Sequence, residues 1–417
     1  MIFSDKQDVG HNEWRPGVAV QRGTNQAGMR AHNERLVLSL VRRNGALSKT
    51  EIARSTGLST QTVSVIMRQL EADRLLRREA PRRGRVGQPL VPLSLDPDGA
   101  YFIGAKVGRR SLEVVLVDFV GAIRHRMMRP HAFPNPGEIV AAIRAEVGRC
   151  AATPGIDSER IAGLGIAVPF ELWNWAEEIG APAEAMGAWR HADIRGELAA
   201  LLPYPVYLQN DATAACGAEL AFGAHSGLLD YIHFFVGAFV GGGLVLNGSL
   251  FTGRTGNAAA LGSMPVPDGR GGTVQLIDRA SLVLLERRVV EAGLPVDALY
   301  DAGADWSPFE PQLEAWIAGA ARGIAHAVAA AAAIIDFEAA VIDGAMPESV
   351  RERLVARVAA DLSRLDLSGI EPPALRAGTI GPSARALGGA SLPLFDRYLL
   401  DQHALAPREA PAGPEPV

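Results

Sequence analysis

The sequence predicts an α/β protein in which a small N-terminal domain precedes a larger body made of two similar lobes. Its 417 residues exceed the length of one ordinary domain. A basic stretch near the N-terminus has the spacing of short helices, and two later stretches repeat one pattern of strands and glycine turns. The expected domains cover residues 26–95, 98–225 and 226–400, with the option that the last helix returns to the first lobe. Residues 1–25 and 401–417 lack apolar periodicity and are expected to be disordered.

The composition is that of a soluble globular protein, with 48% apolar and 21% charged residues. Only two cysteines occur, Cys150 and Cys216, which argues for a reducing compartment and against a disulfide framework or a cysteine zinc site. The polar start of the chain does not resemble a signal peptide. The longest apolar tract, residues 327–335, is mostly alanine and too short to span a bilayer. We therefore expect a cytoplasmic protein without a membrane partner.

Charge is distributed unevenly along the chain. Residues 28–90 contain 13 Lys/Arg and 5 Asp/Glu, so this segment carries a net charge of +8. The remaining residues contain 28 basic and 41 acidic side chains, a net charge of −13. A basic segment joined to an acidic body predicts a polyanionic partner for the basic segment alone.

The basic segment has the start and stop signals of two short helices. Ser48 and Glu51 have the spacing of a capping box, which predicts that a helix begins at Lys49. Gly57 ends this helix and Ser59 caps the next one. The expected buried face of the second helix consists of Val63, Ile66, Met67 and Leu70. Two short helices joined by a glycine-containing turn indicate a helix-turn-helix.

The N-terminal surface of the second helix carries small hydrogen-bonding side chains and one arginine. These groups suit base edges and phosphates in a major groove. The predicted DNA-contacting residues of this helix are Ser59, Thr60, Gln61, Thr62, Ser64 and Arg68.

A basic loop with glycines follows, between two extended runs, and is typical of a β-wing. Arg82, Arg83 and Arg85 are predicted to contact DNA there, with Gly84 allowing the backbone a close approach to a narrow minor groove. The alternative is a helical hairpin with a solvated basic loop. The order of capping box, turn, second helix and arginine-rich loop favours the winged helix-turn-helix.

The acidic body is built twice. Stretches beginning at Tyr101 and Tyr231 each alternate strands with tight turns, as in a β-meander, and each is followed by alternating helices and strands. Two mixed sheets covered by helices, with a cleft between them, indicate an actin/hexokinase-like (ribonuclease H-like) architecture. Ligands of such folds bind at the carboxyl ends of strands, between the lobes. Asn210 and Asp211 end one buried strand there and precede an alanine-rich helix.

Several motifs, in order, resemble the ROK family. They are the winged helix-turn-helix followed by "YFIGAKVG", "VYLQNDATAACGAELAFG" and "GGGLVLNGSLFTG". The resemblance extends from about residue 23 to residue 400. The family contains sugar kinases, and also repressors in which a kinase-like body follows a winged helix, so the resemblance implies the regulator branch.

The resemblance places Asp211 where ROK kinases have their catalytic base, but the phosphate site departs from the family pattern. The kinases' first turn reads D-x-G-G-T, whereas this chain has "KVGRR" at residues 106–110. Phe239 replaces a glycine of the second turn, and Asp343 stands in the glycine pair on the adenosine side. These changes remove the narrow backbone approach that a triphosphate needs.

The sugar and zinc motifs of the family are also changed. The family's A-G-E-I-G-H corresponds to "AAALGS" at residues 258–263, which lacks both the glutamate and the histidine. Its cysteine-rich zinc knuckle corresponds to "DGRGGTVQLID", which contains no cysteine or histidine. The glutamate that follows the knuckle in the family corresponds to Ile277, and a family asparagine corresponds to Ala185. We therefore expect no catalysis, no cofactor and no metal.

Asn210 and Asp211 persist from the family pattern, and two interpretations of them remain open. They either retain a contact with a ligand or serve only as a helix cap. The stretch "VPFELWNWAEEIGAP" offers a second candidate surface, since Trp173, Asn174 and Trp175, with Glu171, Glu177 and Glu178 nearby, could stack on and hydrogen-bond a sugar ring. The alternative is that both tryptophans pack at a lobe hinge. His191 and Asp193 are further candidates for the same cleft.

We therefore expect a sequence-specific DNA-binding regulator, most simply a repressor, whose kinase-like body senses a small molecule such as a sugar or sugar derivative. Its partners would be a palindromic double-stranded DNA operator, the effector, and further copies of the chain in a homodimer or a dimer of dimers. Two alternatives remain open: an active sugar kinase with an appended DNA-binding domain, and a constitutive DNA-binding protein whose body is only a scaffold.

Overall fold

A computed structural model of the chain describes residues 26–82, 90–169, 172–176, 180–225, 227–301 and 303–400. Several expectations fall outside these residues. They concern both terminal segments, the wing residues Arg83 and Arg85, and the acidic residues Glu171, Glu177 and Glu178.

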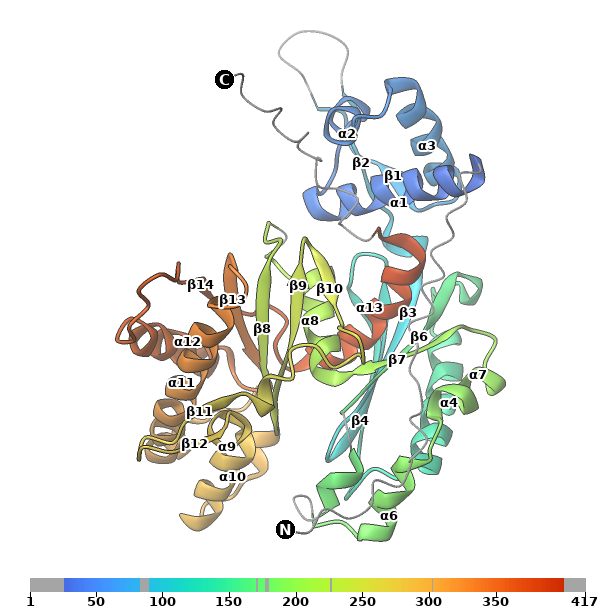
Figure 1. Ribbon diagram of the computed structural model, residues 1–417. Helices are drawn as coiled ribbons and strands as arrows, with labels where there is room; N and C mark the ends of the chain where they lie inside the picture. Colours follow the sequence, from blue (N-terminus) through green and yellow to red (C-terminus); the bar gives the residue numbers. More distant parts are fainter. Residues whose placement is uncertain are drawn as a thin grey trace, which may run out of the picture.

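The N-terminal domain has three helices and a two-stranded antiparallel sheet (Figure 1). Its elements are α1 (Gln26–Asn44), α2 (Lys49–Thr56), α3 (Thr60–Ala72), β1 (Leu76–Arg78) and β2 (Leu93–Leu95). The strands follow directly after α3, which is the order of a winged helix-turn-helix. The predicted fold of this domain is therefore confirmed.

The helix signals of this domain operate as the sequence predicts. Ser48 and Glu51 form the reciprocal capping box at the start of α2. Gly57 ends α2 in the left-handed conformation, with φ of 70°, which glycine adopts without strain. Ser59 caps α3, and the four residues expected to form its apolar face are all buried.

The first lobe contains a five-stranded sheet with the order β5-β4-β3-β6-β7. Its strands are β3 (Tyr101–Val107), β4 (Ser111–Asp118), β5 (Ile123–Pro130), β6 (Ile161–Val168) and β7 (Val206–Asn210). The first three form the predicted antiparallel meander, whereas β6 and β7 run parallel to β3. Two longer helices, α4 (Pro136–Ala151) and α7 (Ile194–Leu201), and the short helix α6 (Ala183–Gly187) belong to this lobe.

The second lobe repeats this sheet. Its order is β10-β9-β8-β13-β14, which has the same succession of antiparallel meander and parallel strands. The strands are β8 (Tyr231–Val236), β9 (Val240–Leu246), β10 (Ser249–Phe251), β13 (Ala339–Gly344) and β14 (Ala374–Ala377). The duplication inferred from the two meanders is therefore present in the topology.

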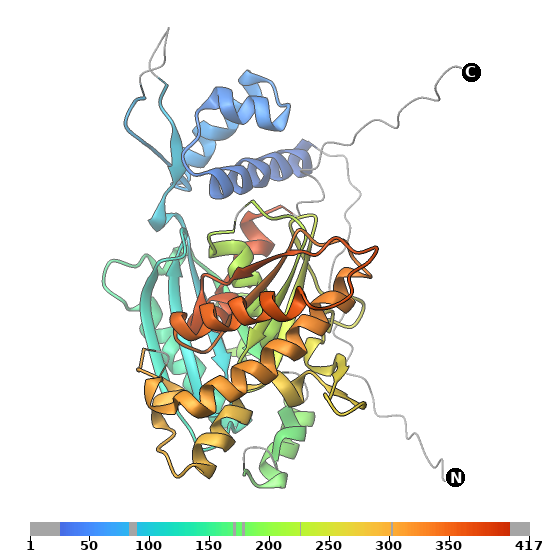
Figure 2. The same cartoon turned by 90° about the vertical axis from the view of Figure 1, so that its left-hand side faces the viewer.

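Helices cover the outer face of the second sheet. In Figure 2, α11 (Glu310–Ala332) and α12 (Glu348–Leu362) lie side by side across it. The segment Ser307–Ala332 is long and apolar enough to cross a membrane, but 56% of its most apolar window is buried against protein, as in a core helix. Its buried residues pack on the strands of the second sheet.

Residues 277–291 form two consecutive helices. The short helix α9 (Ile277–Ala280) and α10 (Leu282–Glu291) are separated at Ser281, whose hydroxyl accepts a hydrogen bond from Val240 N and donates one to Ile277 O. This bonding ties the break to β9. A small hairpin, β11 (Pro265–Pro267) and β12 (Thr273–Gln275), precedes it, where the sequence pattern predicted no strands.

Two helices lie between the sheets (Figure 1). The helix α13 (Ala384–Tyr398) packs on β3 and β6 of the first lobe, and α8 (Asp211–Phe222) packs on β9 of the second lobe and on α13. Glycines allow the close approach. A Cβ placed on Gly165 would lie 1.9 Å from Gly389 O, and one placed on Gly388 would lie 2.0 Å from Ala214 O. The C-terminal helix is thus embedded in the first lobe.

Replacing Gly388 by alanine is expected to lower the free energy of unfolding by about 1–3 kcal/mol, because a new methyl group would overlap the backbone of α8. Thermal melting of the purified chain measures this loss. Gly319→Ala in α11 is the matched control, since a Cβ at Gly319 meets no atom within 4 Å and alanine is the better helix former. Equal melting temperatures for the two variants would contradict the described packing.

Candidate functional site

The exposed face of α3 offers the groups needed to read DNA bases. Gln61 and Arg68 are exposed and Ser64 is half-buried, and this spacing places all three on one side of the helix. Arg68 forms no ion pair with the described residues, and its Nε donates to Ser64 O at 3.2 Å. The guanidinium end is therefore available to a phosphate or a base edge.

The other predicted residues of α3 lie at its start. Thr60 is exposed, whereas Ser59 and Thr62 bond each other. The Ser59 hydroxyl also accepts from Thr62 N at 3.1 Å, so it caps the helix. These two hydroxyls stabilise the helix end as well as facing outward.

Sequence reasoning missed Val65 on the same face. Its side chain is 49% exposed, although its neighbours Ile66 and Met67 are buried. An exposed apolar group between Gln61 and Arg68 suits the methyl group of thymine. The sequence could have indicated this, because Val65 lies four residues after Gln61 and does not belong to the periodic buried face of α3.

The described part of the wing begins with β1 and ends at the bridge between Arg82 and Leu90. Arg82 is exposed and forms no ion pair with the described residues. Arg78, by contrast, pairs with Glu71 at 2.5 Å and fastens the wing to the end of α3. The described base of the wing is therefore held against α3, and Arg82 is exposed at its end.

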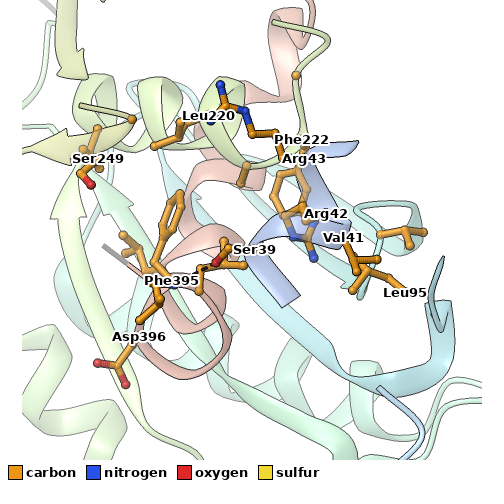
Figure 3. A pocket seen from close by; sticks show the side chains of 18 of the residues that line it. Ser39, Val41, Arg42, Arg43, Leu95, Leu220, Phe222, Ser249, Phe395 and Asp396 are labelled. Carbon is orange, nitrogen blue, oxygen red and sulfur yellow. Dashed lines mark hydrogen bonds between the residues drawn. The ribbon is translucent and has the colours of Figure 1, made fainter. Parts of the chain in front are cut away.

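The N-terminal domain joins the body at a cavity of about 840 Å³ (Figure 3). Ser39 and Arg42 of α1, Phe222 of α8 and Phe395 of α13 line it. The Arg42 guanidinium lies 5.4 Å from the Phe119 ring centre and donates to Phe119 O, and burial lowers the pKa of Arg42 to about 10. A cation held this way ties α1 to the first lobe.

A second cavity, of about 740 Å³, lies between the lobes. The loop after β3, the start of α12 and the segment leading into α13 all contribute to it. We call it the interlobe cleft. Its basic lining residues are Lys106, Arg109, Arg110, Arg126, Arg351 and Arg385.

Lys106 is the most unusual of these cations. Its Nζ donates to Ser111 Oγ at 3.3 Å and forms no ion pair with the described residues. Burial, together with the nearby Arg385, lowers the pKa of Lys106 to about 7, while Glu113 opposes the shift. Glu113 itself pairs with Arg126 at 2.8 Å.

An ionic latch joins the lobes at the cleft. Arg109 and Arg110, in the turn after β3, both donate to the carboxylate of Glu286 in α10. Tyr300 donates to the same carboxylate at 2.7 Å, and Arg110 lies over the Tyr300 ring. The two arginines of this turn therefore connect the first lobe to the second.

Asn210 and Asp211 have different roles. Asn210 Oδ1 accepts from Ala212 N at 3.0 Å and Thr213 N at 3.1 Å, so Asn210 caps α8. Asp211 Oδ2 accepts from the Arg385 guanidinium at 3.2 Å. The cap is therefore Asn210 alone, while Asp211 is attached to a residue of the interlobe cleft.

The aromatic candidates lie on the first lobe. Trp173 and Trp175 are half-buried against its core, and the Trp175 ring centre lies 4.6 Å from that of Phe239. Asn174 and His191 are exposed. None of these four candidates lines either of the two cavities described above. The Trp175–Phe239 contact joins the two lobes, as the hinge-packing alternative requires.

One buried cluster has the residue types of a metal site. The ligand atoms of Glu219, His233 and Asp343 lie within 4.8 Å of one another. Both ring nitrogens of His233 are without a hydrogen-bond partner among the described residues. The carboxylates already accept hydrogen bonds, Glu219 from Thr379 and Asp343 from Arg351. Burial lowers the pKa of His233 to about 4, which keeps its ring neutral.

Family comparisons match both parts of the chain. The ROK family model matches residues 102–274, and the MarR family model matches residues 30–85.

Two sequence relatives cover different shares of the chain. An uncharacterized protein, y4fQ of Sinorhizobium fredii, is 27% identical over 88% of this chain and 91% of its own length. The xylose repressor of Bacillus subtilis is 25% identical over 56% of this chain, a match that spans 60% of the repressor.

Solved structures share the fold. A ROK family transcriptional regulator, a homologue of the E. coli MLC protein, matches with a TM-score of 0.64 and 19% identity, over 90% of this chain and 96% of its own. A ROK family glucokinase from Streptomyces griseus, in complex with glucose and AMPPNP, matches with a TM-score of 0.55 and 23% identity, over 70% of this chain and 99% of its own. The regulator match extends over the N-terminal domain, whereas the kinase match covers a smaller part of the chain.

Proposed function

We propose that this chain, which joins a MarR-type winged helix to a ROK family body, is a DNA-binding transcriptional repressor that responds to a sugar or sugar derivative. The observation that carries the proposal is the exposed face of α3, where Gln61, Val65 and Arg68 stand beside a wing bearing Arg82. Such a face suits a major groove, and the wing suits the adjacent backbone or minor groove.

We infer that the body senses its ligand without phosphorylating it. Arg109 and Arg110 occupy the turn where a triphosphate would need a close backbone approach, and Phe239 packs on Trp175 in the second turn. Asp211, in the position of the base, is engaged by Arg385. A coupled assay with ATP and a panel of sugars should therefore detect no turnover above background.

Dimerisation belongs to the proposal. Two winged helices held by a two-fold axis would read the half-sites of a palindromic operator about one helical turn apart. Linking two such modules multiplies affinity without any new contact. Analytical ultracentrifugation of the full chain should give a dimer or a dimer of dimers, and the operator should lose affinity when one half-site is scrambled.

Replacing Gln61 by alanine should relax base preference at one position of each half-site, costing about 1–3 kcal/mol of discrimination, because a bidentate amide contact would be lost. Fluorescence anisotropy on DNA from upstream of the chain's own gene, with single-base variants, measures this change. Gln275→Ala, at an exposed position in β12 of the second lobe, is the matched control. If Gln61→Ala kept the wild-type base preference, α3 would be excluded as the reading helix at that position.

Arg82 tests the wing in the same assay. If it contacts a phosphate, Arg82→Ala should weaken binding about equally on all sequences and reduce the slope of log affinity against log salt by about 1. A variant with the wild-type slope would remove Arg82 from the interface.

A further inference from the structure

Several basic side chains around the interlobe cleft have N–H donors without a hydrogen-bond acceptor among the described residues. Lys106 has three N–H donors, and Ser111 is its one acceptor among the described residues. The Nε groups of Arg351 and Arg385 are buried and without a partner among the described residues. Buried charged donors without acceptors are costly to keep in a folded protein. Their clustering around one cavity indicates that a ligand supplies the acceptors.

The carboxylates near the cleft do not fill this need. Four of these carboxylates are already paired with arginines. Glu113 pairs with Arg126, and Glu286 pairs with Arg109 and Arg110. Asp211 pairs with Arg385, and Asp343 pairs with Arg351. The remaining lining carboxylates, Glu348 and Asp301, are exposed. Lys106 forms no direct ion pair with any of these carboxylates, although the charges of Glu113 and Asp211 act on it. A small anion in the cleft would pair with it directly.

The cationic side chains reach the cleft from three elements. Residues 379–383 line the cleft directly before α13. The amide of Gly381 in this segment already donates to Asp343 Oδ2. The Arg351 guanidinium lies beside the same segment, 3.0 Å from where a Cβ of Gly381 would be. Side-chain donors thus converge from β3, α12 and α13.

We propose that the interlobe cleft binds a small phosphorylated molecule, a sugar phosphate, with its phosphate held by Lys106, Arg351 and Arg385. The proposal rests on the proposed function and names the chemical class of its effector. A phosphate offers several acceptor oxygens and a charge of about −1.5 to −2, which matches three cations with unfilled donors. Side-chain cations therefore replace the backbone cradle that a nucleotide triphosphate uses.

The helix α13 connects this site to the DNA-binding domain (Figure 1). Arg385 lies in its first turn, at the cleft. Beyond its last turn, Leu400 N donates to Ser39 Oγ of α1 at 3.0 Å, and the Tyr398 ring packs against Phe119. Fifteen residues span about 22 Å at the rise of an α-helix. A displacement at Arg385 would therefore reach α1 through a single helix.

Ligand binding would change the ion pairs that fix the start of α13 and the β3–β4 turn. A phosphate beside Arg385 competes with Asp211 for that guanidinium, and one near the β3–β4 turn competes with Glu286 for Arg109. An effector shifts an equilibrium only if it binds one arrangement better than the other. Exchange of a protein carboxylate for a ligand phosphate is such a difference.

Thermal melting and calorimetry of the full-length protein test the proposal at constant ionic strength. The probes are a panel of hexose and pentose phosphates, the same sugars without phosphate, inorganic phosphate and ADP. Lys106→Met removes one phosphate ligand, and Lys49→Met, exposed in α2, is the control with the same substitution. DNA affinity without any probe is measured in parallel.

At least one sugar phosphate should stabilise the wild type and Lys49→Met alike, and Lys106→Met should weaken its binding about 10- to 100-fold. The corresponding sugar and inorganic phosphate should each bind at least about tenfold more weakly. Equal binding by the neutral sugar, by inorganic phosphate or by ADP would overturn the proposal. So would wild-type affinity in Lys106→Met. If the wild type binds DNA but no phosphate compound binds to it, this ligand site is rejected and the proposed repressor function is kept. If the wild type does not bind DNA, the proposed function itself is rejected.

Discussion

Replacing Asp343 by alanine is expected to lower the free energy of unfolding by about 3–5 kcal/mol, because it leaves the buried Arg351 guanidinium without its counter-ion. Asp343 lies at the end of β13 and is fully buried. Burial raises the pKa of its carboxyl, whereas Arg351 and the amides of Gly381 and Gly344 oppose that shift. The carboxylate therefore fixes both a cation of the interlobe cleft and the segment that leads into α13.

Chemical denaturation of the full chain measures this loss. Asp343→Asn should cost less than alanine, since the amide oxygen can still accept from Gly344 N and Arg351, while the charge and the acceptor for Gly381 N are lost. The control is Asp366→Ala, because the Asp366 carboxylate is exposed and bonds only Ser368 among the described residues. An alanine variant as stable as the Asp366 control would contradict the buried ion pair.

The second large effect is a gain in stability. Lys106→Met should raise the melting temperature of the ligand-free protein at pH 7, because a buried amine is replaced by an apolar side chain of similar length. Each kcal/mol gained corresponds to about 2–4 °C for a domain of about 150–250 residues. The proposed ligand site would then lower the stability of the protein when it is empty, an exchange of stability for function.

The pH dependence of this gain follows from linkage. Burial lowers the pKa of Lys106 from 10.5 to about 7, so between these values the unfolded chain binds a proton that the folded chain does not. The cost of Lys106 is therefore complete below about pH 7 and decreases as the pH rises toward 10.5. The advantage of Lys106→Met over wild type should shrink accordingly between pH 7 and about pH 9. A constant advantage, or a loss of stability at pH 7, would show that the amine is solvated.

Local signals in the sequence account for most of the fold. The capping box of Ser48 and Glu51 and the left-handed Gly57 act within one turn of chain, and they placed α2 and the start of α3 correctly. The two β-meanders carry their pairing in adjacent strands, so their duplication could also be inferred. The break at Ser281 could not, because it depends on a hydrogen bond to β9, 41 residues away.

The candidate sites divide in the same way. The face of α3 was predictable because helix periodicity alone separates Gln61 and Arg68 from the buried side. A cleft between the lobes was predicted, but its full set of cations was not, because they come from three distant segments of the chain. Arg385 and Arg351 do not belong to any motif recognised in the sequence, and only the packing of α13 and α12 brings them near Lys106. The tryptophans stood out by residue type, yet Trp175 packs on Phe239.

The most direct test of the account is fluorescence anisotropy of the full-length protein on DNA from upstream of its own gene. It should be run across a salt series, with and without a panel of sugars and sugar phosphates. The account predicts tight, salt-dependent binding, and at least one compound that changes the DNA affinity by about tenfold or more, a coupling of about 1.4 kcal/mol. Binding no tighter than on unrelated DNA, or DNA affinity that no compound changes, would contradict a ligand-responsive repressor.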